Sequence, residues 1–152
     1  MLIKLRKEHV QIINTHGEST YPDECCGVIL GYLLDDTKIV EEVILTANAW
    51  STEGDNFAEA ENLETTRRRY AIAPQVMLKM QKEARSRNLS IIGIYHSHPD
   101  YPAIPSEWDR LYAWPVYSYI IVSVQNSQAR ELQSWCLDEN HQFQTETIEL
   151  II

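Results

Sequence analysis

The stretch from Ser90 to His98 is SIIGIYHSH, an apolar run that ends in two histidines. A short continuous apolar run bounded by polar residues is typical of a buried strand, so we predict a central strand over Ser90–Ser97. Residues i and i+2 of a strand point to the same side. His96 and His98 therefore present two imidazoles side by side where this strand ends.

The segments around this strand predict a mixed α/β fold. Apolar runs predict further strands at residues 2–6, Cys25–Leu34, Lys38–Ala47, Tyr117–Val124, Ala129–Leu137 and Phe143–Ile152. Helical spacing predicts helices from Lys7 to about His16 with Gly17 as the stop, over residues 74–88 with Pro74 in the first turn and Asn88 as the cap, and over Ser106–Tyr112. Helices interleaved with strands favour a mixed β-sheet flanked by helices.

Composition limits the class of protein. The 152 residues fit one domain, which we predict to span 1–152, and no repeat or linker divides them. The formal net charge of −9 disfavours nucleic acid as a partner. No apolar run reaches the length of a signal peptide or of a membrane span. Cys25, Cys26 and Cys136 form a poor disulfide framework, so we expect buried thiols and a cytoplasmic protein.

A carboxylate downstream of the histidines completes a set of metal ligands. Ser106 and Asp109 are three residues apart at the start of a predicted helix, so they share a face. Prolines 99, 102 and 105 stiffen the loop that returns this helix to His96 and His98. Two histidines and one carboxylate leave a position open on Zn²⁺, which is the arrangement of a catalytic site.

Each of these patterns also has a simpler interpretation. Ser106 and Asp109 match a helix capping box, and a histidine pair occurs in ordinary strands as packing. Met77 and Met80 at helical spacing indicate core packing rather than a cofactor site. His9, His16 and His141 show no spacing to the metal motif, so we expect them at the surface.

The combined motif resembles a known family. His-Ser-His-Pro at 96–99, six residues and then Ser-x-x-Asp at 106–109 are similar to the motif of the JAMM (MPN-plus) metallopeptidases. The segment Glu24–Gly31 resembles the strand of that family that carries a glutamate. The likeness continues through Arg69 and Tyr70, the predicted helix 74–88 with its Pro74, and residues 93–96 and 113–119. Residues 48–64 match least. The resemblance implies the JAMM/MPN fold, which is cytidine-deaminase-like.

The resemblance also implies the role of each site residue. His96, His98 and Asp109 would be the zinc ligands, Glu24 the general acid and base, and Ser106 the group that stabilises the oxyanion. We expect both imidazoles to open into a cleft beside Glu24. Without the resemblance, Glu24 is one of 22 acidic residues and nothing distinguishes it.

The family further implies a substrate class. Its members cut after the C-terminal glycine of a ubiquitin-like β-grasp protein, and this short chain looks like the bacterial members that serve sulfur-carrier proteins with a Gly-Gly end. A homodimer is possible. The alternative from another class is a non-catalytic MPN-type interaction scaffold. Such scaffolds typically lose one or more ligands, whereas this sequence keeps all of them.

Overall fold

The computed structural model describes residues 1–50 and 66–152. In chain order, the elements of these ranges are β1 (Leu2–Arg6), α1 (Lys7–Thr20), β2 (Cys26–Leu34), β3 (Thr37–Thr46), α3 (Pro74–Ser86), β4 (Ser90–Pro99), α4 (Glu107–Leu111), β5 (Ser118–Gln125), β6 (Gln128–Leu137) and β7 (Phe143–Ile151). Most of the poorly matched segment 48–64 lies outside the described residues. None of the described helices is long and apolar enough to span a bilayer.

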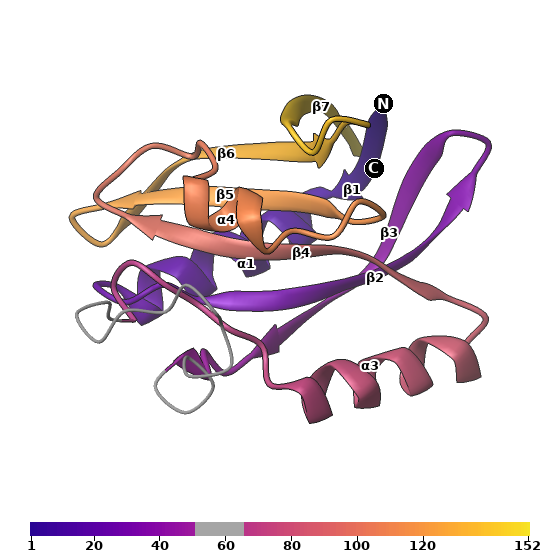
Figure 1. Cartoon of the computed structure of the whole chain (residues 1–152), viewed down its shortest axis with the longest axis horizontal. Helices are drawn as coiled ribbons and strands as arrows, with labels where there is room; N and C mark the ends of the chain where they lie inside the picture. Colours follow the sequence, from indigo (N-terminus) through magenta and orange to yellow (C-terminus); the bar gives the residue numbers. More distant parts are fainter. Residues whose placement is uncertain (51–65) are drawn as a thin grey trace.

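The sheet is mixed, as predicted, but it closes on itself. The strands form a barrel in the order β1-β3-β2-β4-β5-β6-β7 (Figure 1). Strand β1 pairs in parallel with both β3 and β7, and β4 pairs in parallel with β5. The prediction of a sheet simply flanked by helices is therefore corrected, because the short β1 joins the two strands that would otherwise be edges.

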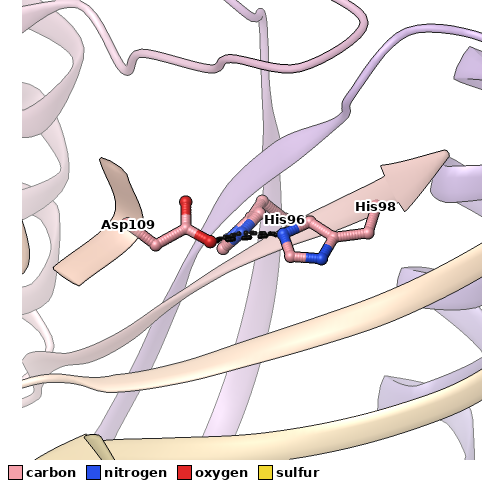
Figure 2. Close-up of side chains that lie close together, drawn as sticks. All are labelled: His96, His98 and Asp109. Atoms are coloured by element: carbon pink, nitrogen blue, oxygen red, sulfur yellow. Dashed lines mark hydrogen bonds and ion pairs between the residues drawn. The ribbon is translucent and has the colours of Figure 1, made fainter. Parts of the chain in front are cut away.

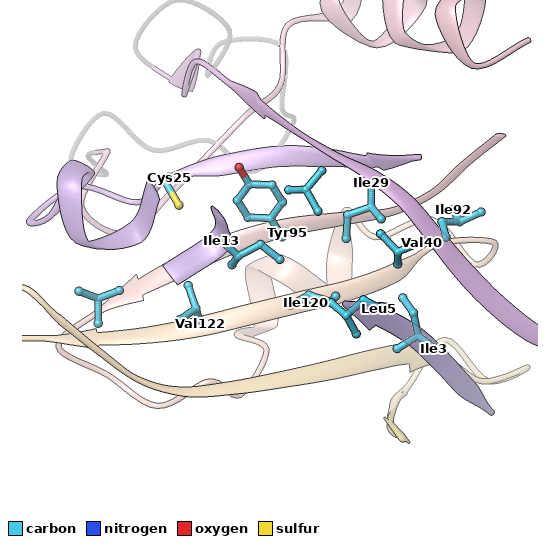
Figure 3. Packing of buried hydrophobic residues seen from close by; sticks show 12 residues of the cluster. Ile3, Leu5, Ile13, Cys25, Ile29, Val40, Ile92, Tyr95, Ile120 and Val122 are labelled. Atoms are coloured by element: carbon cyan, nitrogen blue, oxygen red, sulfur yellow. The ribbon is translucent and has the colours of Figure 1, made fainter. Parts of the chain in front are cut away.

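Two apolar layers explain where the helices lie. One cluster fills the inside of the barrel and includes Ile13 of α1 together with Ile29, Tyr95 and Ile120 of the strands (Figure 3). The other packs α3 against the outer face, where Met80 meets residues of β2 and β4. Successive residues of β2 alternate between the two clusters, as the pleat of a strand requires. The prediction that the methionines pack in the core is confirmed.

Helix α1 does not stop at Gly17, so that prediction is wrong. The helix continues to Thr20, and Gly17 is buried in it. A Cβ on Gly17 would lie only 2.9 Å from Cγ2 of Val124. The glycine lets α1 approach β5 closely and does not end the helix. The helix α3 ends at Ser86 with Arg87 as its C-cap, and Asn88, predicted as the cap, is the next residue, with the left-handed φ of 57° typical of that position.

The prediction that the histidines outside the motif lie at the surface is wrong for His9 and His16. His9 is buried, and its Nδ1 accepts a hydrogen bond from the backbone N–H of Arg6 at 3.0 Å. His16 is half-buried, and its Nδ1 lies 2.7 Å from the hydroxyl of Tyr95. Both serve packing around α1 rather than the surface. The cysteines behave as predicted, because all three are free and buried.

A buried polar network occupies the inside of the barrel beside the start of β1. Lys38 of β3, which is in register with Ile3 of β1, donates from Nζ to Oγ of Ser118 at 2.7 Å. Ser118 and Ser134 in turn donate to the same carboxylate oxygen of Glu146, at 2.6 and 2.8 Å. The network joins β3 to β5, β6 and β7 through side chains, across strands that are not all neighbours in the sheet.

Gly27 supports a test of the β2–β4 pairing. It pairs with Tyr95, and a Cβ there would lie 2.1 Å from the Tyr95 ring and 2.5 Å from the backbone oxygen of Ile44. We expect Gly27→Ala to lower the free energy of unfolding by about 1–3 kcal/mol, because a packed ring and a strand backbone must both shift. Urea denaturation measures this. An unchanged midpoint would contradict the packing of Tyr95 over β2.

Candidate metal centre

The end of β4 places the two motif histidines against α4. His96 and His98 are fully buried, and their Nε2 atoms lie 3.1 Å apart. Oδ2 of Asp109, from α4, lies 3.2 Å from each of these nitrogens. The three side chains point toward one another (Figure 2). The structure therefore brings together the three residues that the sequence singled out as metal ligands.

This spacing fits one small cation. Ligands about 2.0–2.1 Å from a tetrahedral zinc are separated from one another by about 3.3 Å. The measured separations of 3.1 and 3.2 Å match this value closely. Among the described residues, these three form the group of histidine, cysteine and acidic side chains that is close enough to hold a metal ion.

The hydrogen bonds around His98 fix its tautomer. Its Nδ1 lies 2.7 Å from the carbonyl oxygen of Pro102, which can only accept, so Nδ1 carries the proton. A neutral ring then directs the lone pair of Nε2 toward Asp109. Burial lowers the pKa of His96, although the charge of Asp109 opposes this, so the neutral ring of His96 is favoured. Nδ1 of His96 has no hydrogen-bond partner among the described residues.

A capping box orients Asp109. Its backbone N–H donates to Oγ of Ser106 at 3.0 Å, while the N–H of Ser106 donates to Oδ2 of Asp109 at 2.9 Å. The simpler interpretation of this motif as a helix capping box is thus correct, and the same Oδ2 of Asp109 also faces both histidines. Burial alone would raise the pKa of Asp109, but the neighbouring His96 and His98 lower it strongly. Asp109 therefore stays ionised, as a metal ligand must be.

Glu24 lies two residues before the start of β2, on the side of the strand where β2 pairs with the histidine end of β4. Cys26 pairs with His96, and Cys25 and Ser97 exchange two hydrogen bonds of 2.8 and 3.1 Å that continue the pairing beyond β2. The carboxylate of Glu24 is fully buried and accepts a hydrogen bond from the hydroxyl of Tyr101 through Oε2. Its Oε1 has no hydrogen-bond partner among the residues described.

The surroundings of Glu24 disfavour its charge. Burial raises its pKa well above the usual range, and the charge of Asp109 raises it further. The hydrogen bond from Tyr101 and the charges of Arg69 and Arg68 oppose this shift. Glu24 is thus a buried carboxyl with one free oxygen and a tendency to hold a proton, which is suited to proton transfer.

Two tyrosines that sequence reasoning missed enclose the histidines. The ring of Tyr70 stacks on His96 at 4.4 Å, and the ring of Tyr101 stacks on His98 at 4.0 Å. Tyr101 also connects His98 to Glu24, since its hydroxyl donates to that carboxylate. Neither lies in a periodic segment. The one signal in the sequence was that Tyr101 lies between the histidines and Asp109, inside the motif itself.

Within residues 1–50 and 66–152, the expected cleft at the imidazoles is not found, because both rings are completely covered. The described residues instead form a pocket of about 150 Å³ that reaches the site through the side chain of Asp109. Its walls are largely aromatic and include Tyr70, Trp108, Tyr112 and Trp114. The stacked tyrosines account for the difference, since they occupy the space next to the histidines.

Most of the chain matches one known protein family. Residues 6–138 match the family of prokaryotic homologs of the JAB domain. The chain belongs to this family. The predicted resemblance to short prokaryotic JAMM/MPN proteins is confirmed.

The known relatives of this JAB-domain chain have two different names. The chain is 34% identical over 74 residues to the "desampylase" of Pyrococcus furiosus, in an alignment that covers 47% of this chain and 49% of that protein. The chain thus spans about half the length of this relative. It is 24% identical over 135 residues to the "CysO-cysteine peptidase" of Mycobacterium tuberculosis, covering 88% of this chain and 82% of that one.

Solved structures show the same JAB-domain fold. Protein DSY2949 from Desulfitobacterium hafniense matches with a TM-score of 0.78 and 25% identity, over 99% of this chain and 93% of that one. A protein from Salinibacter ruber matches with a TM-score of 0.70 and 29% identity, over 99% and 92%. The barrel and its helices are therefore shared with relatives of low identity.

The capping role of Ser106 can be measured separately from chemistry. We expect Ser106→Ala to lower the free energy of unfolding by about 1 kcal/mol, because the N–H of Asp109 loses its acceptor. Ser106→Asn is the matched control, since asparagine caps helices about as well as serine. Thermal denaturation of both variants tests this. Equal losses in the two variants would contradict a capping role.

Proposed function

We propose that this chain is a zinc-dependent peptidase that hydrolyses the amide or isopeptide bond after the C-terminal glycine of a small ubiquitin-like or sulfur-carrier protein. In this proposal His96, His98 and Asp109 hold the metal, Glu24 moves the proton and Ser106 stabilises the oxyanion. The whole chain, residues 1–152, acts as one catalytic domain.

One observation carries the proposal. Three metal-type ligand atoms converge at 3.1–3.2 Å beside a buried carboxyl whose Oε1 has no partner among the described residues. A scaffold needs no such arrangement, because burying imidazoles and carboxylates without partners costs stability. A hydrolase needs it, because a base must lie beside the group that activates water.

The residues divide the reaction between them. When bound, zinc would polarise the scissile carbonyl and lower the pKa of a water to about 7. Glu24 accepts a proton from the attacking water and gives it to the amide nitrogen, so the C–N bond breaks and the amine leaves. Oγ of Ser106 already accepts from the N–H of Asp109, so its own hydrogen is left to donate to the oxyanion.

The substrate class is supported by the relatives. The similar proteins are named desampylase and CysO-cysteine peptidase, and the second aligns over most of both chains. A peptidase for a small carrier protein therefore agrees with the family, the relatives and the site. An interaction scaffold would be the outcome if the chain bound neither metal nor such substrates.

We expect about one zinc ion per chain in protein purified without chelator. His98→Ala should lose most of this metal, because three ligands are the minimum of a typical catalytic site and only two would remain. His141→Ala is the matched control, since this half-buried imidazole bonds to the backbone oxygen of Arg110 outside the cluster. Elemental analysis measures the content. Equal zinc in both variants would exclude the proposed ligands.

We expect Glu24→Gln to reduce turnover by about 10²–10⁴-fold, because an amide of the same size cannot accept the proton of water. Zinc content should stay at the level of the wild type, since Glu24 is not one of the proposed ligands. The assay is mass spectrometry of a panel of β-grasp proteins that end in Gly-Gly and carry one further cysteine.

Glu131→Gln is the control for this substitution, because it makes the same chemical change at an exposed position of β6. It should cleave at the rate of the wild type. If Glu24→Gln also cleaved at that rate, the proton would be moved by another group. If the wild type cleaved no protein of the panel while holding zinc, the carrier would be the wrong substrate class.

A further inference from the structure

An arginine run lies beside Glu24 in this acidic chain. Arg67, Arg68 and Arg69 are consecutive, whereas the chain as a whole has a formal net charge of −9. The backbone holds them next to the site. The N–H of Glu24 donates to the carbonyl of Thr66 at 2.7 Å, and the amide of Asn48 donates to the carbonyls of both Glu24 and Arg69 at 3.0 Å.

The arginines differ in what they face. The charge of Arg67 acts on Asp100, and the guanidinium of Arg69 lies over the ring of Trp108 at 4.6 Å. The guanidinium of Arg68 lies over the ring of Tyr101, 6.0 Å from its centre, and the Arg68 residue is exposed. Arg68 forms no ion pair with any described residue. Its charge is therefore available to a partner in solution.

Arg68 is also the outermost member of a chain of contacts that starts at the metal ligands. The ring of His98 stacks on Tyr101, the hydroxyl of Tyr101 donates to Glu24, and the guanidinium of Arg68 lies over the same Tyr101 ring. A cation over the face of a tyrosine is held in orientation by the ring. A guanidinium held in this way presents its fork to a planar anion, and a carboxylate accepts it bidentately.

We propose that Arg68 binds the free α-carboxylate of a single amino acid at the leaving side of the scissile bond, which makes the site selective for a carrier extended by one residue. This inference rests on the proposed function. Arg68 is assigned here as a specificity-determining residue, and not as a group that takes part in the bond cleavage.

The position of Glu24 gives the reason for choosing the leaving side. Glu24 gives its proton to the leaving nitrogen, so this nitrogen must lie within hydrogen-bond reach of the carboxyl. In an amino acid, the α-carboxylate is attached to the carbon next to that nitrogen. The carboxylate therefore lies close to Glu24. The charge of Arg68 acts on this same Glu24 side chain and lowers its pKa. The ε-amine of a lysine in an isopeptide bond has no carboxylate nearby. Arg68 therefore forms no such ion pair with an isopeptide substrate.

The test compares two forms of one substrate. The probe is a β-grasp protein that ends in Gly-Gly and is cleaved by the wild type, extended by one cysteine either as the free acid or as the C-terminal amide. We expect the wild type to have a KM about tenfold lower for the acid, as is typical of a charge-assisted hydrogen bond, with a similar kcat for both. Arg68→Ala should raise the KM for the acid to that for the amide and leave the amide unchanged.

Two further variants separate charge from geometry. Arg68→Lys keeps the charge without the fork and should recover only part of the preference. Arg85→Ala removes the same charge from the last turn of α3 and should keep the full preference of the wild type. Binding of the acid and the amide to Glu24→Gln, measured by calorimetry, should show the same tenfold difference without turnover.

Each remaining outcome overturns the assignment. Equal cleavage of acid and amide by the wild type means that no group binds the α-carboxylate, while the proposed peptidase function stands. An equal loss on both forms in Arg68→Ala means that Arg68 binds the carrier surface or only supports Tyr101. A preference retained in Arg68→Ala assigns it to another residue. If the wild type cleaves no extended carrier at all, the proposed function fails, and this inference fails with it.

Discussion

The antiparallel pairing of β2 with β4 is the constraint on which the site depends. It places Cys26 opposite His96, and the two hydrogen bonds between Cys25 and Ser97 extend the contact by one residue before the start of β2. The pairing also needs Gly27, whose missing side chain leaves room for the ring of Tyr95. A buried carboxyl and two imidazoles are thus positioned by the register of one strand pair.

The other half of the site is held by the short helix α4. Its capping box uses Oδ2 of Asp109 for the helix and presents the same oxygen to both histidines. One carboxylate therefore orients a helix end and completes a cluster of ligands. This double use explains why the local pattern alone was ambiguous. A helix capping box and a metal site can both use an aspartate at this position. The two interpretations differ only in whether Asp109 also lies close to His96 and His98.

Local patterns were sufficient for most strands and insufficient for closure of the sheet. The apolar runs placed strands such as Ser90–Pro99 to within about two residues, because buried strands are continuous apolar segments. Closure depends on β1, which pairs with strands remote in sequence, and no local signal reports such pairing. Gly17 was misassigned for a related reason, since the close approach of α1 to β5 is set by tertiary packing. Glu24 came from the family resemblance, whereas the stacking of Tyr70 and Tyr101 on the histidines and the position of Arg68 over Tyr101 came from the structure.

The bond from His98 to Pro102 has a consequence for how the site tolerates change. The acceptor is a main-chain carbonyl, and every amino acid supplies one. Side chains in the loop between the histidines and α4 can therefore vary without changing which nitrogen of His98 holds the proton, as long as the backbone keeps its path. Proline restricts that path through its fixed φ. Which nitrogen of His98 holds the proton is thus independent of the exposed side chains of the loop, and these can change while the centre beneath them stays the same.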